Sequence, residues 1–223
     1  MKFSLSRRIA AEFLGTGFLV AAVVGSGIMG ERLSGGNVAI ALLANTIATG
    51  AALAALILAF LPISGAHLNP VVSMAEMFRG GFAWNEAVLY IAAQVCGGIA
   101  GTACANIMFA LPAFSISHHV RTGAPLWFSE FVATFGLLLV IRTVARFTPD
   151  WLPFAVGAYI VAAYWFTAST SFANPAVAIA RSLSDTFAGI RPVDVPAFLG
   201  AQLAGGFSAA IVSDWLSFQS SDG

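Results

Sequence analysis

The pattern of hydrophobic positions divides this 223-residue chain into long apolar stretches separated by short polar connections. A membrane-spanning helix needs roughly 20 predominantly apolar residues. Stretches of that kind use up nearly the whole sequence, so we predict an all-α membrane protein with six transmembrane helices. The predicted spans cover approximately residues 9–29, 37–62, 86–111, 127–147, 152–170 and 195–217.

The composition supports a membrane location and argues against several other classes of protein. Hydrophobic residues make up 59% of the chain and charged residues 9%, whereas soluble domains carry about 25% charged residues. The net charge of zero gives no indication of nucleic-acid binding. No nucleophile–base set, phosphate-binding loop or metal-ligand cluster is visible, and the adjacent His118 and His119 do not make a ligand set. We therefore expect neither an enzyme nor a bound cofactor or metal.

Two short strings interrupt this apolar pattern, Asn69-Pro70-Val71 and Asn174-Pro175-Ala176. Asn is a preferred N-cap residue, and Pro is favoured at the first helical position. Each string therefore predicts the start of a short helix, over 69–78 and 174–183. Each half-helix would be about 14 Å long, so that two of them, meeting at their N-termini, would span about one bilayer core.

The chain also repeats itself. Glu12-Phe13 and Glu130-Phe131 open matching spans, an Asn-Pro string follows in each half, and Gln94 and Gln202 each precede a pair of glycines. Each half contains an odd number of spans, so the second copy must be inverted relative to the first, as in many transport proteins. We predict a single transmembrane channel domain, 1–223, built as an inverted 3+3 repeat with two re-entrant half-helices. The repeats cover residues 1–115 and 116–223.

The segments before the half-helices, 62–68 and 169–173, indicate a pore. Non-helical backbone at membrane depth is tolerated only where it is buried in protein or lines a water-filled path. Asn69 and Asn174 would offer amide donors to a neutral solute, while the positive ends of the two helices would repel cations. An ion-coupled secondary transporter is an alternative that the inverted repeat alone permits. It would need a buried charge at its substrate site.

The Asn-Pro strings, AEFLGTG (11–17), SGAHLNP (64–70) and the Gln-x-x-Gly-Gly pairs together resemble the aquaporin and aquaglyceroporin (major intrinsic protein) family. The resemblance extends over essentially the whole chain. It implies a homotetramer in which each protomer has its own pore, and a second constriction that sets selectivity. Counting from the Asn residues, that selectivity filter falls on Thr49, Ala162, Ser171 and Val177.

These four residues depart from the family pattern, because they include no aromatic residue, no His and no Arg. Their size and charge predict a wide, weakly polar and uncharged opening that passes solutes bulkier than water. Arg181, one turn beyond Val177, has two interpretations. It is either a displaced filter arginine or a residue that extends its charge to the membrane interface or pairs with Asp185 at i,i+4.

The resemblance also implies supporting roles for three buried polar residues. Glu12 and Glu130 would accept hydrogen bonds that hold the non-helical pore segments in place. His67, within SGAHLNP, would anchor the first of these segments.

The function predicted from these features is a passive channel for small uncharged solutes. The Asn-Pro-Val string and the missing filter arginine resemble the bacterial branch associated with arsenic-resistance operons. That implies arsenite and methylated arsenicals as solutes, with glycerol, urea and water as further ones; a plain water or glycerol facilitator is the alternative. The positive-inside rule predicts a plasma (inner) membrane protein, in contact with lipids, with cytoplasmic termini. Lys2, Arg7, Arg8, Arg79, Arg142 and Arg146 would face the cytoplasm, and Arg32, Arg121, Arg181 and Arg191 the outside.

Overall fold

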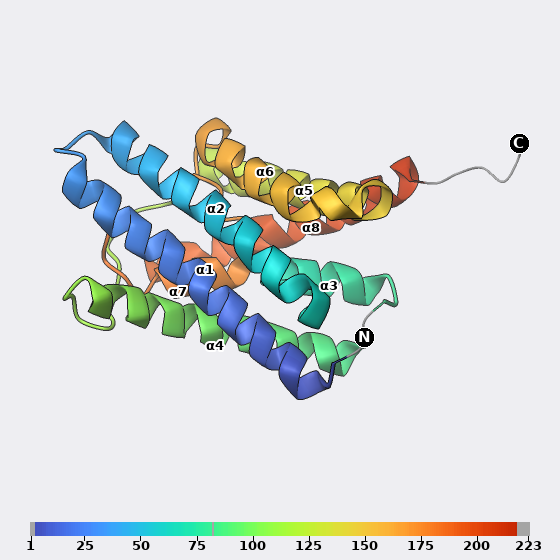
Figure 1. Cartoon of the computed structure of the whole chain (residues 1–223). Helices are drawn as coiled ribbons and strands as arrows, with labels where there is room; N and C mark the ends of the chain where they lie inside the picture. Colours follow the sequence, from blue (N-terminus) through green and yellow to red (C-terminus); the bar gives the residue numbers. More distant parts are fainter. Residues whose placement is uncertain (1–2, 82, 218–223) are drawn as a thin grey trace, which may run out of the picture.

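The computed structural model describes residues 3–81 and 83–217, and Lys2, used above for orientation, lies outside them. The described residues form a bundle of long helices around two short ones, α3 and α7 (Figure 1). Short 3₁₀ helices, η1 (Pro149–Trp151) and η2 (Pro192–Asp194), precede α6 and α8. The α-helices are α1 (Leu5–Leu33), α2 (Val38–Ser64), α3 (Pro70–Phe78), α4 (Trp84–Met108), α5 (Ala124–Phe147), α6 (Leu152–Phe166), α7 (Pro175–Arg181) and α8 (Val195–Leu216).

Five of the described helices are long and apolar enough to cross a membrane: α1, α2, α4, α5 and the stretch Pro192–Leu216 that contains α8. The remaining predicted span, 152–170, is shorter than expected, because α6 ends at Phe166. Thr167 has an extended backbone, and its Oγ1 donates to the Ala163 carbonyl at 2.7 Å. The Thr167 amide donates to the same carbonyl at 3.2 Å, so both donors of Thr167 bond to the last turn of α6.

The two half-helices begin where the Asn-Pro strings predict. In both, the Asn side chain caps the helix and Pro occupies its first turn. α3 also ends at the predicted residue, Phe78, whereas α7 ends at Arg181, before the predicted position 183. The reason is that the amides of Ser182 and Leu183 bond three residues back, to Ile179 and Ala180, so the last turn tightens.

The same packing recurs in the two halves of the chain. α1 packs against α2 and α4, α5 packs against α6 and α8, and α2 meets α6 where the halves join. Glycines allow the closest approaches: a Cβ at Gly97 of α4 would lie 2.2 Å from the Phe13 carbonyl oxygen, and one at Gly205 of α8 would lie 2.3 Å from that of Phe131. The start of α1 and the end of α8 lie at the same end of the bundle (Figure 1).

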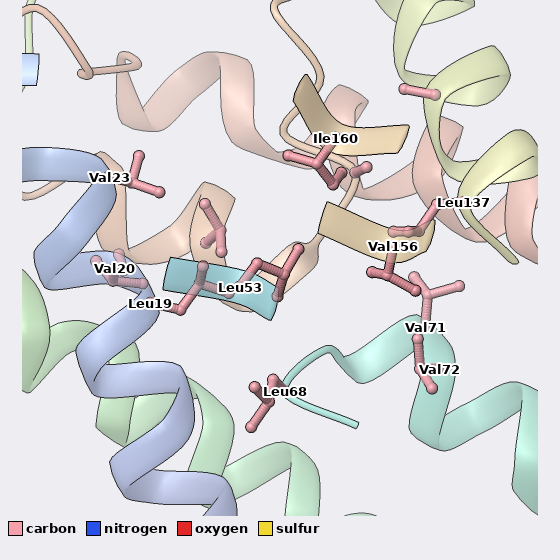
Figure 2. Close-up of a cluster of buried hydrophobic side chains, with 14 of the residues drawn as sticks. Leu19, Val20, Val23, Leu53, Leu68, Val71, Val72, Leu137, Val156 and Ile160 are labelled. Atoms are coloured by element: carbon pink, nitrogen blue, oxygen red, sulfur yellow. The ribbon is translucent and has the colours of Figure 1, made fainter. Parts of the chain in front are cut away.

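Buried aliphatic side chains from both halves converge around the half-helices (Figure 2). They come from α1, α2, α3, α5 and α6 and from the segment before α3. Most of them also line the central cavity described below. The residues labelled in Figure 2 are Leu19, Val20, Val23, Leu53, Leu68, Val71, Val72, Leu137, Val156 and Ile160.

Candidate solute pathway

The segments that lead into α3 and α7 share an unusual backbone. Ala66 and Leu68 have φ of 47° and 49°, and Ser171 and Ala173 have φ of 49° and 47°. These are the third and first residues before each capping Asn. Left-handed conformations at residues other than Gly cost about 1–3 kcal/mol each and gather at functional sites. The surrounding contacts must therefore hold both segments in place.

Glu12 supplies that support for the first segment. Its Oε1 accepts hydrogen bonds from Ser64 Oγ at 2.7 Å and from the His67 amide at 3.0 Å. Its Oε2 accepts from the Leu68 amide at 2.7 Å and from Gln94 Nε2 at 2.8 Å. Four donors thus converge on one fully buried carboxylate, which compensates the cost of placing that charge away from water.

Glu130 occupies the matching place beside the second segment. Its two oxygens accept hydrogen bonds from the amides of Phe172 and Ala173, both at 2.9 Å, and from Gln202 Nε2 at 2.6 Å. Like Glu12, this carboxylate is fully buried. These three hydrogen bonds connect Glu130 to the backbone of the second segment and to Gln202, as those of Glu12 connect it to the first segment and to Gln94.

Each capping Asn also joins the two halves of the molecule. Asn69 Oδ1 accepts from the Val71 amide at 3.0 Å, while its Nδ2 donates to the Ala173 carbonyl at 2.8 Å. In the reverse direction, Asn174 Nδ2 donates to the Leu68 carbonyl at 2.7 Å. Since an amide nitrogen carries two hydrogens, each Asn retains one donor for a solute.

A cavity of about 480 Å³ passes both Asn side chains. One wall is aliphatic and consists largely of the side chains in Figure 2. The non-helical segments 65–68 and 171–173 also line the cavity and, with the two Asn side chains, form the more polar part of its lining. Charged residues line both ends: Arg181 at one, and Glu76, Arg79, Arg142, Arg146 and Asp214 at the other.

Three of the four predicted filter residues line this cavity, namely Thr49, Ser171 and Val177. Ala162 does not: it is exposed on the outer face of α6. The cavity face of α6 instead carries Tyr164, whose hydroxyl donates to Thr49 Oγ1 at 3.4 Å.

Of the predicted filter residues, Ala162 therefore does not face the cavity, whereas the aromatic side chain of Tyr164, which was not predicted, does. A count back from Asn174 runs through the non-helical segment after Phe166, whose path does not preserve helical register. The correct face can be found from helical spacing instead, because Val156, Ile160 and Tyr164 recur every four residues and all three line the cavity.

Arg181 lies inside the protein, with an exposed fraction of 2%, and lines the cavity. Its guanidinium carbon is 3.5 Å from the centre of the Phe172 ring, and its Nε donates to the Ala188 carbonyl. Of the interpretations left open for Arg181, the pairing with Asp185 is wrong. Asp185 instead accepts from the His118 amide at 2.9 Å and pairs with His118 Nδ1 at 3.0 Å, and these bonds lower the pKa of Asp185.

His67 lies beside the first non-helical segment, at the cavity wall. Its Nδ1 is 3.0 Å from Ser73 Oγ in α3, and its ring centre is 5.4 Å from that of Tyr90. Ser73 also accepts a hydrogen bond from Gln94 at 2.9 Å. These contacts connect His67 to the same group of side chains that surrounds Glu12.

The charged residues at the far end of the cavity were not predicted as a site. Asp214 of α8 pairs with Arg142 of α5 and lies 3.6 Å from Arg79, just after α3, which also pairs with Glu76 at 3.7 Å. The Arg142 side chain is 3% exposed. No motif brings these residues together in the sequence, since they come from the ends of three different helices.

Two helix N-termini meeting inside an all-helical membrane bundle, beside a cavity with an aliphatic and a polar wall, define a channel for small neutral solutes. A model of the major intrinsic protein family matches residues 1–150 of the chain. The chain belongs to this family, which is one of channels and not of enzymes, and it is an aquaglyceroporin.

Individual relatives agree with this assignment. Aquaglyceroporin AqpS of Rhizobium meliloti is 54% identical over 96% of this chain and 92% of its own length. Aquaporin NIP3-1 of Oryza sativa is 34% identical over 65% of this chain and 47% of its own length. The X-ray structure of the Plasmodium falciparum aquaglyceroporin has a TM-score of 0.76, with 24% identity, and covers 95% of this chain and 96% of its own. The predicted fold class is thereby confirmed.

Proposed function

We propose that this channel conducts arsenite, together with other small uncharged solutes that carry several hydroxyl or amide groups, such as glycerol and urea. Arsenite is the uncharged As(OH)₃ near neutral pH, and its hydroxyl face is similar to that of glycerol. The proposal rests above all on Val177, a cavity-lining residue at a position where aquaglyceroporins typically carry Arg. Methylated arsenicals, with one apolar substituent, fit the same two-sided cavity.

The transport step follows from the two walls of the cavity. A solute with hydroxyls on one side exchanges hydrogen bonds with water for hydrogen bonds with the carbonyls and with the free amide hydrogens of Asn69 and Asn174. Its less polar side contacts Leu53, Val156 and Ile160. A cation has no such exchange available, because both helix N-termini present positive partial charge at the same place.

We further propose the assembly and orientation that the family resemblance and the charge pattern support. The channel is a homotetramer in the plasma (inner) membrane, with one pathway through each protomer and both termini in the cytoplasm. In this orientation Arg181 lies toward the outside, and Arg142 and Asp214 lie at the cytoplasmic mouth.

A plain water or glycerol facilitator is the second candidate function. One observation favours it: Tyr164 and Arg181 both line the cavity, and two side chains of that size would leave less room than the four predicted filter residues alone.

Stopped-flow measurements on proteoliposomes distinguish the two functions. We expect the wild type to pass arsenite and glycerol, and Val177→Arg to reduce both fluxes by about tenfold or more, a barrier increase of ~1.4 kcal/mol, while water still passes. Val177→Ala is the matched control and should retain the solute fluxes, since it adds neither bulk nor charge. A wild type that passes water alone would support the facilitator, and an unchanged Val177→Arg would remove Val177 from the filter.

A further inference from the structure

Phe172, the residue between Ser171 and Ala173 in the second non-helical segment, lies against two guanidinium groups. The guanidinium carbon of Arg181 is 3.5 Å from its ring centre, and that of Arg121 is 5.1 Å from it. Both distances fall within the range of a cation–π contact. Phe172 itself is 4% exposed and packs edge-on against Phe198 of α8, at 5.2 Å between ring centres. The ring therefore offers a fixed surface to both arginines.

Arg121 comes from the connection between α4 and α5, far from α7 in the sequence. Its Nε donates to the Gly189 carbonyl at 2.8 Å, and its Nη1 lies 3.4 Å from the Ser169 carbonyl. Its own amide donates to Asp194 Oδ2 at 2.8 Å. Arg121 thus contacts the segment that leads into α7 and the segment that leaves it.

The two arginines bind neighbouring backbone carbonyls. Arg181 Nε donates to Ala188, and Arg121 Nε donates to Gly189, the next residue. One short stretch after α7 therefore holds both guanidinium groups beside the same ring. A displacement of Arg121 would release Gly189, Ser169 and one side of Phe172 together, and all three adjoin the place where Arg181 is held.

Arg181 has an unused donor in this arrangement. Its Nη1 has no hydrogen-bond partner among residues 3–81 and 83–217, and within those residues no carboxylate forms an ion pair with it. Glu130 of α5, the carboxylate beside the second non-helical segment, accepts hydrogen bonds from two backbone amides and from Gln202. The positive charge of Arg181 at the cavity wall is therefore not neutralised by a neighbour.

We propose that Arg181 is a specificity-determining residue that excludes cations at its end of the pathway, and that Arg121 and Phe172 are positioning residues that hold it there. This assignment goes beyond the choice of neutral solute, which the proposed function places on Val177 and its neighbours. In this proposal the residue that excludes cations, Arg181, lies one helical turn beyond Val177, the residue proposed to set the width of the opening.

The test compares two probes of nearly the same size and shape, neutral urea and the guanidinium cation, in proteoliposome flux assays. The wild type should reject guanidinium. Arg181→Gln should raise the ratio of guanidinium to urea permeability by about tenfold or more, the equivalent of ~1.4 kcal/mol. Arg121→Gln should raise the ratio in the same direction by a smaller factor, and Arg121→Lys should retain more of the exclusion.

The double variant Arg121→Gln, Arg181→Gln tests whether Arg121 acts by positioning Arg181 or has a general structural role. If Arg121 acts through Arg181, adding Arg121→Gln to Arg181→Gln will not raise the ratio further, whereas independent effects would multiply. Arg32→Gln is the control, because Arg32 also contacts a phenyl ring, that of Phe109, and a carbonyl but does not line the cavity. Thermal unfolding of each variant checks that it is folded.

Three results would overturn the proposal. The first is guanidinium exclusion that persists in Arg181→Gln, and the second is a wild type that passes guanidinium as readily as urea. The third result concerns the double variant. If Arg121→Gln raises the ratio of guanidinium to urea permeability as much in the Arg181→Gln background as in the wild type, Arg121 does not act through Arg181. Arsenite and glycerol fluxes test the proposed function separately, since they depend on neutral solutes and on Val177.

Discussion

The two non-helical segments have the same supports but present different charges to the pathway. Each has a buried Glu beneath it, left-handed residues at the first and third positions before its Asn, and a Gln from a neighbouring long helix. Seven residues after each Asn, however, the first half-helix carries Glu76 and the second carries Arg181, and both line the cavity. The duplicated scaffold holds the backbone alike in both halves, while single side chains give the two ends of the pathway different charges.

The surroundings of these two residues differ as well. Glu76 pairs with Arg79 at 3.7 Å, and Arg79 and Arg142 share Asp214, so positive and negative charges alternate at that end. Arg181 is stacked on a phenyl ring and has no ion-pair partner within the described part of the chain. At one end of the cavity two carboxylates therefore lie among the arginines and pair with two of them, and at the other the charge of Arg181 has no paired carboxylate among the described residues.

The largest effect on stability should come from replacing the buried Glu that supports each non-helical segment. In Glu12→Gln, one of the two oxygen acceptors is replaced by an NH₂ donor, which faces buried donors. Hydrogen bonds to charged groups contribute about 1.5–3 kcal/mol each. We expect a loss of ~3 kcal/mol or more in the free energy of unfolding and a loss of water permeability. Glu130→Gln should cost less, because Glu130 accepts three hydrogen bonds where Glu12 accepts four.

Thermal unfolding in detergent and water flux per folded protein measure this difference. Equal losses in the two variants would show that the count of hydrogen bonds does not govern the cost. A Glu12→Gln channel with normal flux would contradict the supporting role altogether.

A smaller effect concerns the one residue by which the Asn-Pro strings differ, Val71 in the first and Ala176 in the second. A Cβ on Gly206 would lie 2.1 Å from Val71 Cγ1, whereas one on Gly98, which adjoins Ala176, would lie 3.2 Å or more from its nearest neighbours. Overpacking of a filled core costs about 1–3 kcal/mol. We expect Gly206→Ala to destabilise the protein by that amount and Gly98→Ala by less, as measured by thermal unfolding.

A second substitution makes this prediction specific. Val71→Ala should restore most of the stability lost in Gly206→Ala, because it removes the methyl group that the new Cβ would meet. If the double variant is no more stable than Gly206→Ala alone, the contact between Val71 and Gly206 is not the reason for the valine.

The parts of the molecule that could be predicted from the sequence are those that depend on interactions between neighbouring residues. The starts of α3 and α7 could be predicted because an N-cap Asn and a first-turn Pro act within a few residues of each other. The face of α6 could not be found by counting from Asn174, because a non-helical segment lies between them. The contacts of Arg121 and Asp214 could not be predicted either. Arg121 lies in the connection between α4 and α5 and Asp214 near the end of α8, where no periodic pattern in the sequence indicates which residues they meet.

The smallest effect should follow from Asp214→Asn. The Asp214 side chain is 56% exposed, whereas that of its partner Arg142 is 3% exposed. The Asn side chain keeps an oxygen acceptor for Arg142, and ion pairs that reach the solvent contribute about 0–1 kcal/mol. We expect a loss of ~1 kcal/mol or less in unfolding free energy and an unchanged ratio of guanidinium to urea permeability. A change in that ratio as large as the one expected for Arg181→Gln would show that the Asp214 end also selects by charge, and the contrast between the two ends would fail.

The crossed hydrogen bonds of the two Asn side chains also bear on how the channel assembles. Asn69 bonds to Ala173, and Asn174 bonds to Leu68, across 104 and 106 residues of chain. Contacts between such distant residues require a large loss of chain entropy before they form. While the chain is being synthesised, Asn69 has no acceptor until the second non-helical segment has been made. The centre of the pathway is therefore complete only when both halves are in the membrane, so a half-inserted chain has no finished pathway through which solutes could leak.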